Sequence, residues 1–306
     1  MSSHLTRLFL LFLLGIAATC NAQQNSPKQT NSTFQFRILD PQNASYKEAL
    51  DQLTAEFGTS TLVVQNDLDK KSDAKDVLVT LGIVSLKKAL NQKGDYTIVA
   101  LLATSEQIRE QRAAIQNSGK KVIAIYSDPD PMNQLRLITA IFPSHIGVAV
   151  FLSPAAYDRR QAIKTAAGDL RLDIDFYKVD DEDSLFKLLA RSTQKKVILA
   201  LPDAQIYNPQ TVRNFILTSY RNNQAIIGYS QSLVKAGGLA SVSSNLNDIF
   251  ADLSDTLLKL NSGINVPSHY SRYFTIVVNH DVANSLNIVV DPAISKLAIQ
   301  PTSRAR

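Results

Sequence analysis

The sequence has 306 residues, of which 45% are hydrophobic, and carries a formal net charge of +5. This length and apolar fraction are typical of a globular protein with two lobes of ordinary domain size. Lysine and arginine are scattered among acidic residues, with no block of five like charges. That distribution argues against a protein that binds nucleic acid or a membrane surface.

An apolar run, Leu8–Ala18, lies close to the N-terminus. It has 11 residues, whereas a membrane-spanning helix needs about 20, so the run predicts a cleaved signal peptide over residues 1–22 and export to the periplasm. Two processing sites stay open: cleavage after Ala22, or a lipoprotein anchored at Cys20 as the alternative. Because Cys20 is the single cysteine, the folded part keeps no free thiol for disulfides or thiolate metal sites.

Residues 23–33 are polar and without apolar periodicity, which predicts a flexible leader, so we expect the fold to begin near Phe34. From there, short β-branched or apolar runs alternate with amphipathic stretches, a pattern that predicts successive βαβ units. The strands expected in this half of the chain are 34–39, 61–64, 76–81, 97–102 and 121–126, and the expected helices are 46–57, 85–91 and 105–118.

The same alternation starts again after Pro143. Two of its strands, Ile146–Leu152 and Val197–Leu201, are apolar at every position, which is typical of parallel strands covered on both faces. The sequence therefore predicts an α/β fold of two doubly wound parallel-sheet lobes. The strands expected here are 146–152, 173–179, 197–201 and 225–229, and the expected helices are 155–170, 183–190 and 209–222.

The rest of the chain is too short for a third domain and is expected to be shared between the lobes through a multiply crossed hinge. It holds strands at 239–242 and 274–277 and a helix at 246–260. We expect residues 34–144 plus 240–262 in the N-terminal lobe and residues 145–239 plus 263–306 in the C-terminal lobe. Such crossings place the carboxyl ends of the strands on facing sides of a cleft that closes by hinge motion. Gly237 and Gly238 are expected to supply backbone freedom at this hinge.

Five segments of the chain carry a resemblance to a known family. They are SDPDPMNQLRLI (127–138), IFPSHIGVAVFLSP (141–154), LALPDAQIYNPQTVRNFILTSYRNNQAIIGYS (199–230), GGLASVSSN (237–245) and VNHDVANSLNI (278–288). They resemble the type I periplasmic binding proteins, in the ABC-transporter substrate-binding branch that includes tryptophan and aromatic amino-acid receptors. The match covers residues 120–290 well and 34–119 in outline, where Gly82 and Ser85 approximate the family's Gly-Ser or Gly-Thr turn.

The resemblance implies a place for each of these segments. The Asp-Pro turn is expected to close the first lobe, the Pro-Asp turn to line the cleft, and the Ser-Val-Ser strand to return to the first lobe. It also implies a monomer that binds a small molecule, needs no cofactor and delivers its ligand to an ABC permease in the inner membrane.

The candidate ligand-binding residues lie mainly at the carboxyl ends of predicted strands. Asp128 sits between two prolines in a rigid turn, where it either receives an amino group or hydroxyl of a ligand or caps the helix that starts at Met132. At such strand ends, helix N-termini offer backbone N–H groups to a carboxylate or to a cap. Tyr207 is expected either to stack on a flat ligand or to pack in the core. The full set is Gly82, Ser85, Ser127, Asp128, Ser153, Pro154, Asp203, Tyr207, Tyr229 and Ser230.

A hydrolase is the sharper alternative at one of these positions. Residues 228–232 nearly spell a nucleophile elbow around Ser230, but its second glycine is missing. A catalytic triad would need His280 with Asp252 or Asp255, and these lie in segments that the binding-protein pattern already explains. We therefore expect no enzyme. No histidine pair has ligand spacing and the acidic run Asp180–Asp183 lacks the glycine of a calcium loop, so no metal site is expected either.

Together these features predict a periplasmic solute-binding protein that captures a small organic solute, with an amino acid as the candidate, for an ABC transporter. The alternative is a periplasmic sensor or accessory module that keeps the fold without feeding a permease. The weaker resemblance in the first lobe motivates this alternative, because a protein that no longer supplies a permease can lose part of its ligand contacts.

Overall fold

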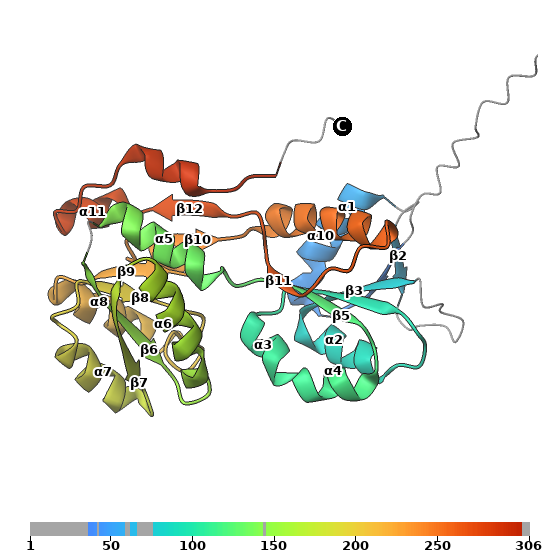
Figure 1. Ribbon diagram of the computed structural model, residues 1–306, viewed down its shortest axis with the longest axis horizontal. Helices are drawn as coiled ribbons and strands as arrows, with labels where there is room; N and C mark the ends of the chain where they lie inside the picture. Colours follow the sequence, from blue (N-terminus) through green and yellow to red (C-terminus); the bar gives the residue numbers. More distant parts are fainter. Residues whose placement is uncertain (1–35, 42, 59–61, 66–75, 143–144, 302–306) are drawn as a thin grey trace, which may run out of the picture. The chain divides into compact units, whose positions relative to one another are not determined.

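The computed structural model describes residues 36–41, 43–58, 62–65, 76–142 and 145–301. The expected signal peptide, the leader and Phe34 lie outside these ranges, as does Pro143. The described residues form two six-stranded sheets, each with helices on both faces (Figure 1). The predicted fold class, an α/β protein with two parallel-sheet lobes, is confirmed. No helix in this part of the chain is long and apolar enough to cross a membrane.

The first lobe is built on a fully parallel sheet. Its elements are β1 Phe36–Leu39, a 3-10 turn η1 Ala44–Tyr46, α1 Lys47–Phe57, β2 Leu62–Gln65, β3 Val77–Leu81, α2 Gly82–Asn91, β4 Thr97–Leu101, α3 Ser105–Glu110, α4 Arg112–Ser118, β5 Val122–Tyr126, α10 Leu246–Asn261 and β11 His269–Tyr270. The strand order is β11-β5-β4-β3-β1-β2. Along β3, Val77 and Val79 face the core under α1 and α10, whereas Leu78 faces the core under α2. This alternation buries the strand on both sides.

The second lobe repeats this plan with one antiparallel edge. Its elements are α5 Pro131–Ile141, β6 Gly147–Leu152, a 3-10 turn η2 Tyr157–Arg159, α6 Arg160–Asp169, β7 Asp173–Lys178, α7 Glu182–Arg191, β8 Val197–Leu199, α8 Val212–Arg221, β9 Ala225–Gly228, α9 Gln231–Lys235, β10 Ala240–Ser243, β12 Thr275–Val278, α11 His280–Ser285 and η3 Pro292–Leu297. The strand order is β12-β10-β9-β8-β6-β7, with β12 antiparallel to β10. Val150 of β6 faces the core that includes α5 and α6, and Phe151 faces α7 and α8.

Some helices and strands differ from the expected ones, and the residues around them explain the differences. The stretch expected as one helix, 105–118, is two helices, and Thr104 begins the first of them with a capping box in which it exchanges hydrogen bonds with Gln107. Strand β11 and helix α9 were not expected, because two and five residues are too few to show a hydrophobic period.

The chain passes between the lobes at positions that differ from the expected boundaries. Helix α5 packs its apolar face into the core of the second lobe, so the first crossing is at residues 127–130 and not near residue 144. Strand β10 pairs with β9 and β12, which places the Ser-Val-Ser strand in the second lobe. Residues 263–270 stay with the first lobe, because β11 pairs with β5 there. Burial of α5 and of both faces of β10 decides these boundaries.

Gly237 and Gly238 also lie away from the crossings. They form the turn between α9 and β10 inside the second lobe, where Gly238 donates a backbone hydrogen bond to Leu233 O. The φ angle of Gly237 is +124°, and an added Cβ would lie 2.8 Å from Ile216. Their expected hinge role is therefore wrong: the glycines allow a tight turn against a packed helix.

Gly82, at the start of α2, has a positive φ angle and lies close to the side chain of Tyr46. Its φ angle is +75°, and a Cβ there would lie 2.3 Å from Oη of Tyr46. We expect Gly82→Ala to lower the free energy of unfolding by about 1–3 kcal/mol, measured by urea denaturation followed by circular dichroism. Gly58→Ala is the matched control, because Gly58 has a φ of +69° but nothing within 4 Å of an added Cβ. Equal losses for the two variants would mean that Tyr46 moves aside freely.

Candidate functional site

A cavity of about 360 Å³ lies where strand ends of both lobes converge. Its lining comes from the ends of β4 and β5 in the first lobe, of β8 and β9 in the second, and from the crossing after β10. The lining residues are Thr104, Ser127, Asp128, Pro202, Tyr229, Ser230, Gln231, Ser243, Ser244 and Asn245. A space of this size holds a small organic molecule, and polar groups at strand carboxyl ends are the usual ligand contacts of open α/β sheets.

Asp128 is the buried charge of this cavity. Its side chain is 4% exposed, and its two oxygens accept hydrogen bonds from the backbone N–H and the hydroxyl of Ser105, each at 2.6 Å. Burial raises the pKa of Asp128, although the Ser105 hydrogen bonds and the positive charge of Arg159 oppose the rise. The helix after this turn is capped by Asp130, which accepts from Met132 N at 2.9 Å. Capping of α5 therefore does not account for Asp128, whose remaining lone pairs can accept from a solute.

Two tyrosines, Tyr207 and Tyr229, form an aromatic pair in the second lobe. Tyr229 lines the cavity, and its ring meets that of Tyr207 edge to face at 5.9 Å. Tyr207 is itself buried against Phe215, its hydroxyl has no hydrogen-bond partner, and burial raises its pKa well above the ordinary value. Tyr207 thus packs in the core and supports Tyr229 rather than reaching the cavity. Ser230 beside it caps α9, with its hydroxyl accepting from Leu233 N at 3.2 Å.

The crossing after β10 supplies the cavity's third side. The hydroxyl of Ser244 donates to the carbonyl of Tyr273 at 2.7 Å, which ties this crossing to the later one before β12. Asn245 caps α10 through Asp248 N. Ser243 differs from both, because its buried hydroxyl has no hydrogen-bond partner in the described structure. It is therefore a group that a ligand or a water molecule can satisfy.

The remaining expected site residues lie outside the cavity lining. Asp203 accepts from Ser153 N at 2.9 Å and from Gln205 N at 3.1 Å, and so joins the loops after β6 and β8. Pro154 follows in the first of these loops. Gly82 and Ser85 belong to the first turn of α2, where Ser85 is buried with an unpartnered hydroxyl. Of the ten expected residues, the cavity brings together Ser127, Asp128, Tyr229 and Ser230.

Sequence reasoning missed six lining residues, namely Thr104, Pro202, Gln231, Ser243, Ser244 and Asn245. Pro202 directly follows a predicted strand and Thr104 lies two residues after another, so their positions at strand ends were available as a signal. The last three were inside a segment that had been identified as a crossing. Their place in the lining depends on which sheet β10 joins. The sequence predicts the sheet of the first lobe, whereas β10 lies in that of the second.

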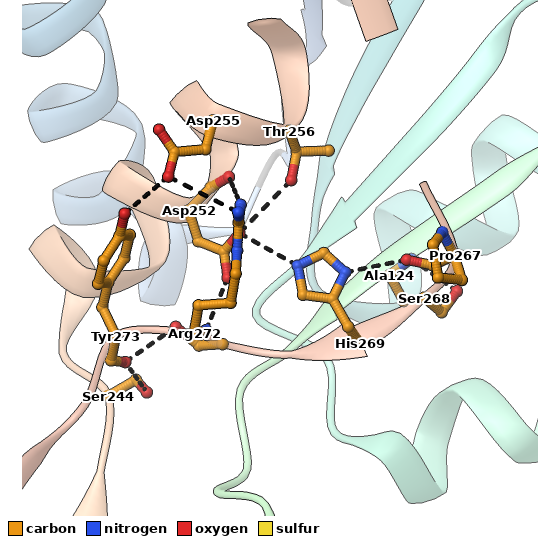
Figure 2. A network of polar contacts seen from close by, with 11 residues as sticks. Ala124, Ser244, Asp252, Asp255, Thr256, Pro267, Ser268, His269, Arg272 and Tyr273 are labelled. Carbon is orange, nitrogen blue, oxygen red and sulfur yellow. Dashed lines mark hydrogen bonds and ion pairs between the residues drawn. The ribbon is translucent and has the colours of Figure 1, made fainter. Parts of the chain in front are cut away.

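A polar network holds the later crossing to α10. Figure 2 shows His269 and Arg272 converging on Asp252. Asp252 is fully buried and accepts from Arg272 N at 2.8 Å, Arg272 Nε at 2.9 Å and His269 Nε2 at 3.1 Å. Burial by itself raises the pKa of Asp252, but these hydrogen bonds outweigh it and the pKa is lowered. Burial also acts on His269, where it lowers the pKa. The hydrogen bond to Asp252 outweighs burial, so the pKa of His269 is raised.

This network does not fit the hydrolase alternative. Asp252 is bound by His269 and Arg272, and Asp255 accepts from the hydroxyl of Tyr273 at 2.7 Å. In the part of the chain that the structure describes, no hydrogen bond joins His280 to Ser230. The triad that the hydrolase alternative would need is therefore not assembled. Among the same residues, no group of three or more His, Cys, Asp or Glu side chains is placed to hold a metal ion.

Charged side chains also connect the two lobes beside the cavity. Arg109 of α3 lies 3.4 Å from an oxygen of Asp158 in η2 and 3.5 Å from the carbonyl of Ala155. In the opposite direction, Arg159 of η2 lies 3.9 Å from Oε2 of Glu106 in α3. These contacts join α3 to the loop after β6.

No protein-family model matches the sequence, and no curated protein shows a significant match to it. Solved structures do match. A ligand-free, open substrate-binding protein with adhesive properties from Clostridium difficile superimposes with a TM-score of 0.62 at 14% identity, over 86% of this chain and 97% of that one. The lobes described here have the fold of the ABC solute-binding proteins.

Two further structures share this binding-protein fold. An ABC domain from Streptococcus pneumonia in complex with L-Trp has a TM-score of 0.57 and 17% identity, over 88% of this chain and 99% of that one. A conserved domain protein from Vibrio cholerae has a TM-score of 0.56 and 17% identity, with the same coverage. At these identities the comparisons establish the fold and leave the tryptophan and aromatic branch as an expectation.

Proposed function

We propose that this chain is a periplasmic solute-binding protein that captures a small organic solute between its lobes and delivers it to an ABC permease of the inner membrane. The observation that carries the proposal is the cavity, which takes its lining from strand ends of both lobes and from a crossing between them. Binding needs no covalent chemistry, because a solute stabilises the closed form through its higher affinity for that form.

An amino acid, aromatic ones included, is the candidate solute. Asp128 supplies a buried carboxylate for an amino or hydroxyl group, and the ring of Tyr229 supplies a flat apolar surface in the same cavity. The fold relative that carries L-Trp is consistent with this choice but does not decide it. Export through a signal peptide at residues 1–22 and action as a monomer belong to the same proposal.

The alternative, a sensor or accessory module without a permease, has one observation in its favour. Gly82 and Ser85, the first-lobe turn that the resemblance predicts as ligand-binding, are absent from the cavity lining. Retention of ligand binding together with a failure to stimulate a permease reconstituted with its ATPase would favour this alternative.

A thermal-shift screen tests the proposal. The mature protein is heated with amino acids, sugars, aromatic metabolites and nucleobases at millimolar concentration. A ligand at about 100 times its Kd adds roughly 2.7 kcal/mol to the stability and raises Tm by several degrees. The expected result is a shift with one solute class.

Tyr229→Ala locates the binding site. We expect this variant to bind the strongest solute of the screen at least roughly tenfold more weakly, because it removes an aromatic wall of the cavity. Tyr220→Ala is the matched control, since Tyr220 lies on α8 and is 47% exposed. Isothermal titration measures both affinities. Equal binding by Tyr229→Ala and the wild type would place the solute elsewhere.

A further inference from the structure

Arg159 is a buried cation whose hydrogen-bonding groups the protein leaves unused. Its side chain is 8% exposed, and both terminal nitrogens of its guanidinium lack a hydrogen-bond partner. Oε2 of Glu106 is 3.9 Å from Nη1, a distance that provides electrostatic attraction but no hydrogen bond. A buried charged donor left in this state destabilises the fold, because it has lost its hydrogen bonds to water without replacing them.

Glu106 is already engaged by another residue. Nη2 of Arg109 contacts both of its carboxylate oxygens, and the same guanidinium also pairs with Asp158. Glu106 therefore cannot turn toward Arg159 without giving up Arg109. The donors of Arg159 need an acceptor from outside these side chains.

Arg159 is not one of the residues that line the cavity, but it lies near several of them. It ends η2 in the loop that leaves the carboxyl end of β6, the same sheet edge from which β8 and β9 send Pro202 and Tyr229 to the cavity. On the facing lobe, its neighbour Glu106 adjoins Ser105, which holds Asp128 in the lining. The positive charge of Arg159 lowers the pKa of Asp128 and so offsets part of the rise that burial causes.

We propose that Arg159 receives a carboxylate of the bound solute, so that the protein selects small carboxylic acids. The planar guanidinium presents two parallel N–H donors that match the two oxygens of a carboxylate. Asp128 in the same region accepts from a donor group, so the preferred solute carries an amino or hydroxyl group as well as its carboxylate. This inference rests on the proposed solute-binding function and names the solute class for it.

Matched solutes that differ in their carboxylate groups test the inference. Isothermal titration compares L-tryptophan with L-tryptophanamide, D-galacturonate with D-galactose, and succinate with succinamide, on the full mature protein. For the pair that binds, the solute with the carboxylate is expected to bind at least tenfold more tightly than its partner without one. Arg159→Gln is expected to abolish this difference, and Arg159→Lys to keep part of it.

A neighbouring arginine provides the control. Arg160 lies over the ring of Tyr157 at 4.6 Å and is exposed, so Arg160→Gln is expected to leave the preference for the acid unchanged. Since the guanidinium of Arg159 donates no hydrogen bond within the protein, Arg159→Gln is also expected to have a Tm no more than about 2 °C below that of the wild type. A fall of Tm by more than 5 °C would show a structural role and overturn the inference.

The outcomes separate this inference from the proposed function. If neutral solutes bind as tightly as acids, or if Arg159→Gln keeps the preference for the acid, the protein is a solute receptor but Arg159 is not its carboxylate-binding residue. If no compound of the pairs or of the wider screen binds, the solute-binding function fails and the inference fails with it.

Discussion

Asp252→Ala is expected to lower the free energy of unfolding by about 3 kcal/mol, the lower end of the cost of breaking a buried ion pair. Asp252 is fully buried, whereas the side chain of its partner Arg272 is 34% exposed and can regain water. The substitution also leaves Nε2 of His269 without its acceptor. Because these contacts join α10 to the segment that leads back to β12, the crossing should loosen along with the fold. Urea denaturation followed by circular dichroism measures the loss.

The neighbouring carboxylate on the same helix is the control. Asp255 accepts from the hydroxyl of Tyr273 and lies 3.7 Å from Nη1 of Arg272, but it is 27% exposed. Asp255→Ala is expected to cost about 1 kcal/mol or less, as partly exposed charge pairs do. Equal costs at the two positions would mean that burial of Asp252 does not determine its contribution.

The cost of Asp252→Ala is expected to depend on pH in a direction that the pKa shifts fix. The lowered pKa of Asp252 stabilises the fold above its ordinary value of 3.8, and that stability is lost as pH falls through the folded pKa. The raised pKa of His269 stabilises the fold below its ordinary value of 6.5, and that stability is lost as pH rises through the folded pKa. The difference between wild type and variant should therefore be larger at pH 5.5 than at pH 8.5.

Asp128→Asn is expected to weaken solute binding by roughly 10- to 100-fold, the value of a hydrogen bond to a charged group. The substitution removes the buried negative charge of the cavity but keeps one oxygen to accept from Ser105 N. The fold should therefore survive, with an unchanged Tm in the absence of solute. Isothermal titration with the strongest solute of the thermal-shift screen measures the affinity.

The pH profile and a matched variant complete this prediction. Burial raises the pKa of Asp128, so wild-type affinity for a solute with an amino group should fall as pH decreases through that pKa. Asp128→Asn should lack this dependence. Asp130→Asn is the control, because Asp130 caps α5 and asparagine caps equally well. A similar loss of affinity in both variants would indicate a general electrostatic effect of the turn and not a contact to the solute.

Several features of the fold and the site followed from residue pattern. Apolar runs such as Val197–Leu201 predicted parallel strands with two covered faces, and the structure places them in the middle of a sheet. The Asp-Pro turn predicted polar groups after β5, and Ser127 and Asp128 line the cavity there. These are local consequences of hydrophobic period and turn chemistry, which adjacent residues specify.

Other predictions failed where two distant segments had to choose between neighbours. Nothing in the sequence of β10 states which sheet it joins, since Ala240 and Val242 are apolar enough for either core. Asp128 and Asp130 were equally suited to cap α5, and the contact of Asp128 with Ser105, 23 residues earlier, assigned the cap to Asp130. Partners of this kind are set by packing and not by spacing.

The sequence by itself determined the two α/β lobes, the strand ends that carry polar groups and the sharing of the residues after 238 between the lobes. Tertiary structure alone decided where the chain crosses, which strand ends meet at one cavity, and that the guanidinium of Arg159 is buried without a hydrogen-bond partner. The physical reason is that period and turn chemistry act over a few residues, whereas burial and hydrogen bonding of a side chain depend on elements that are far apart in the sequence.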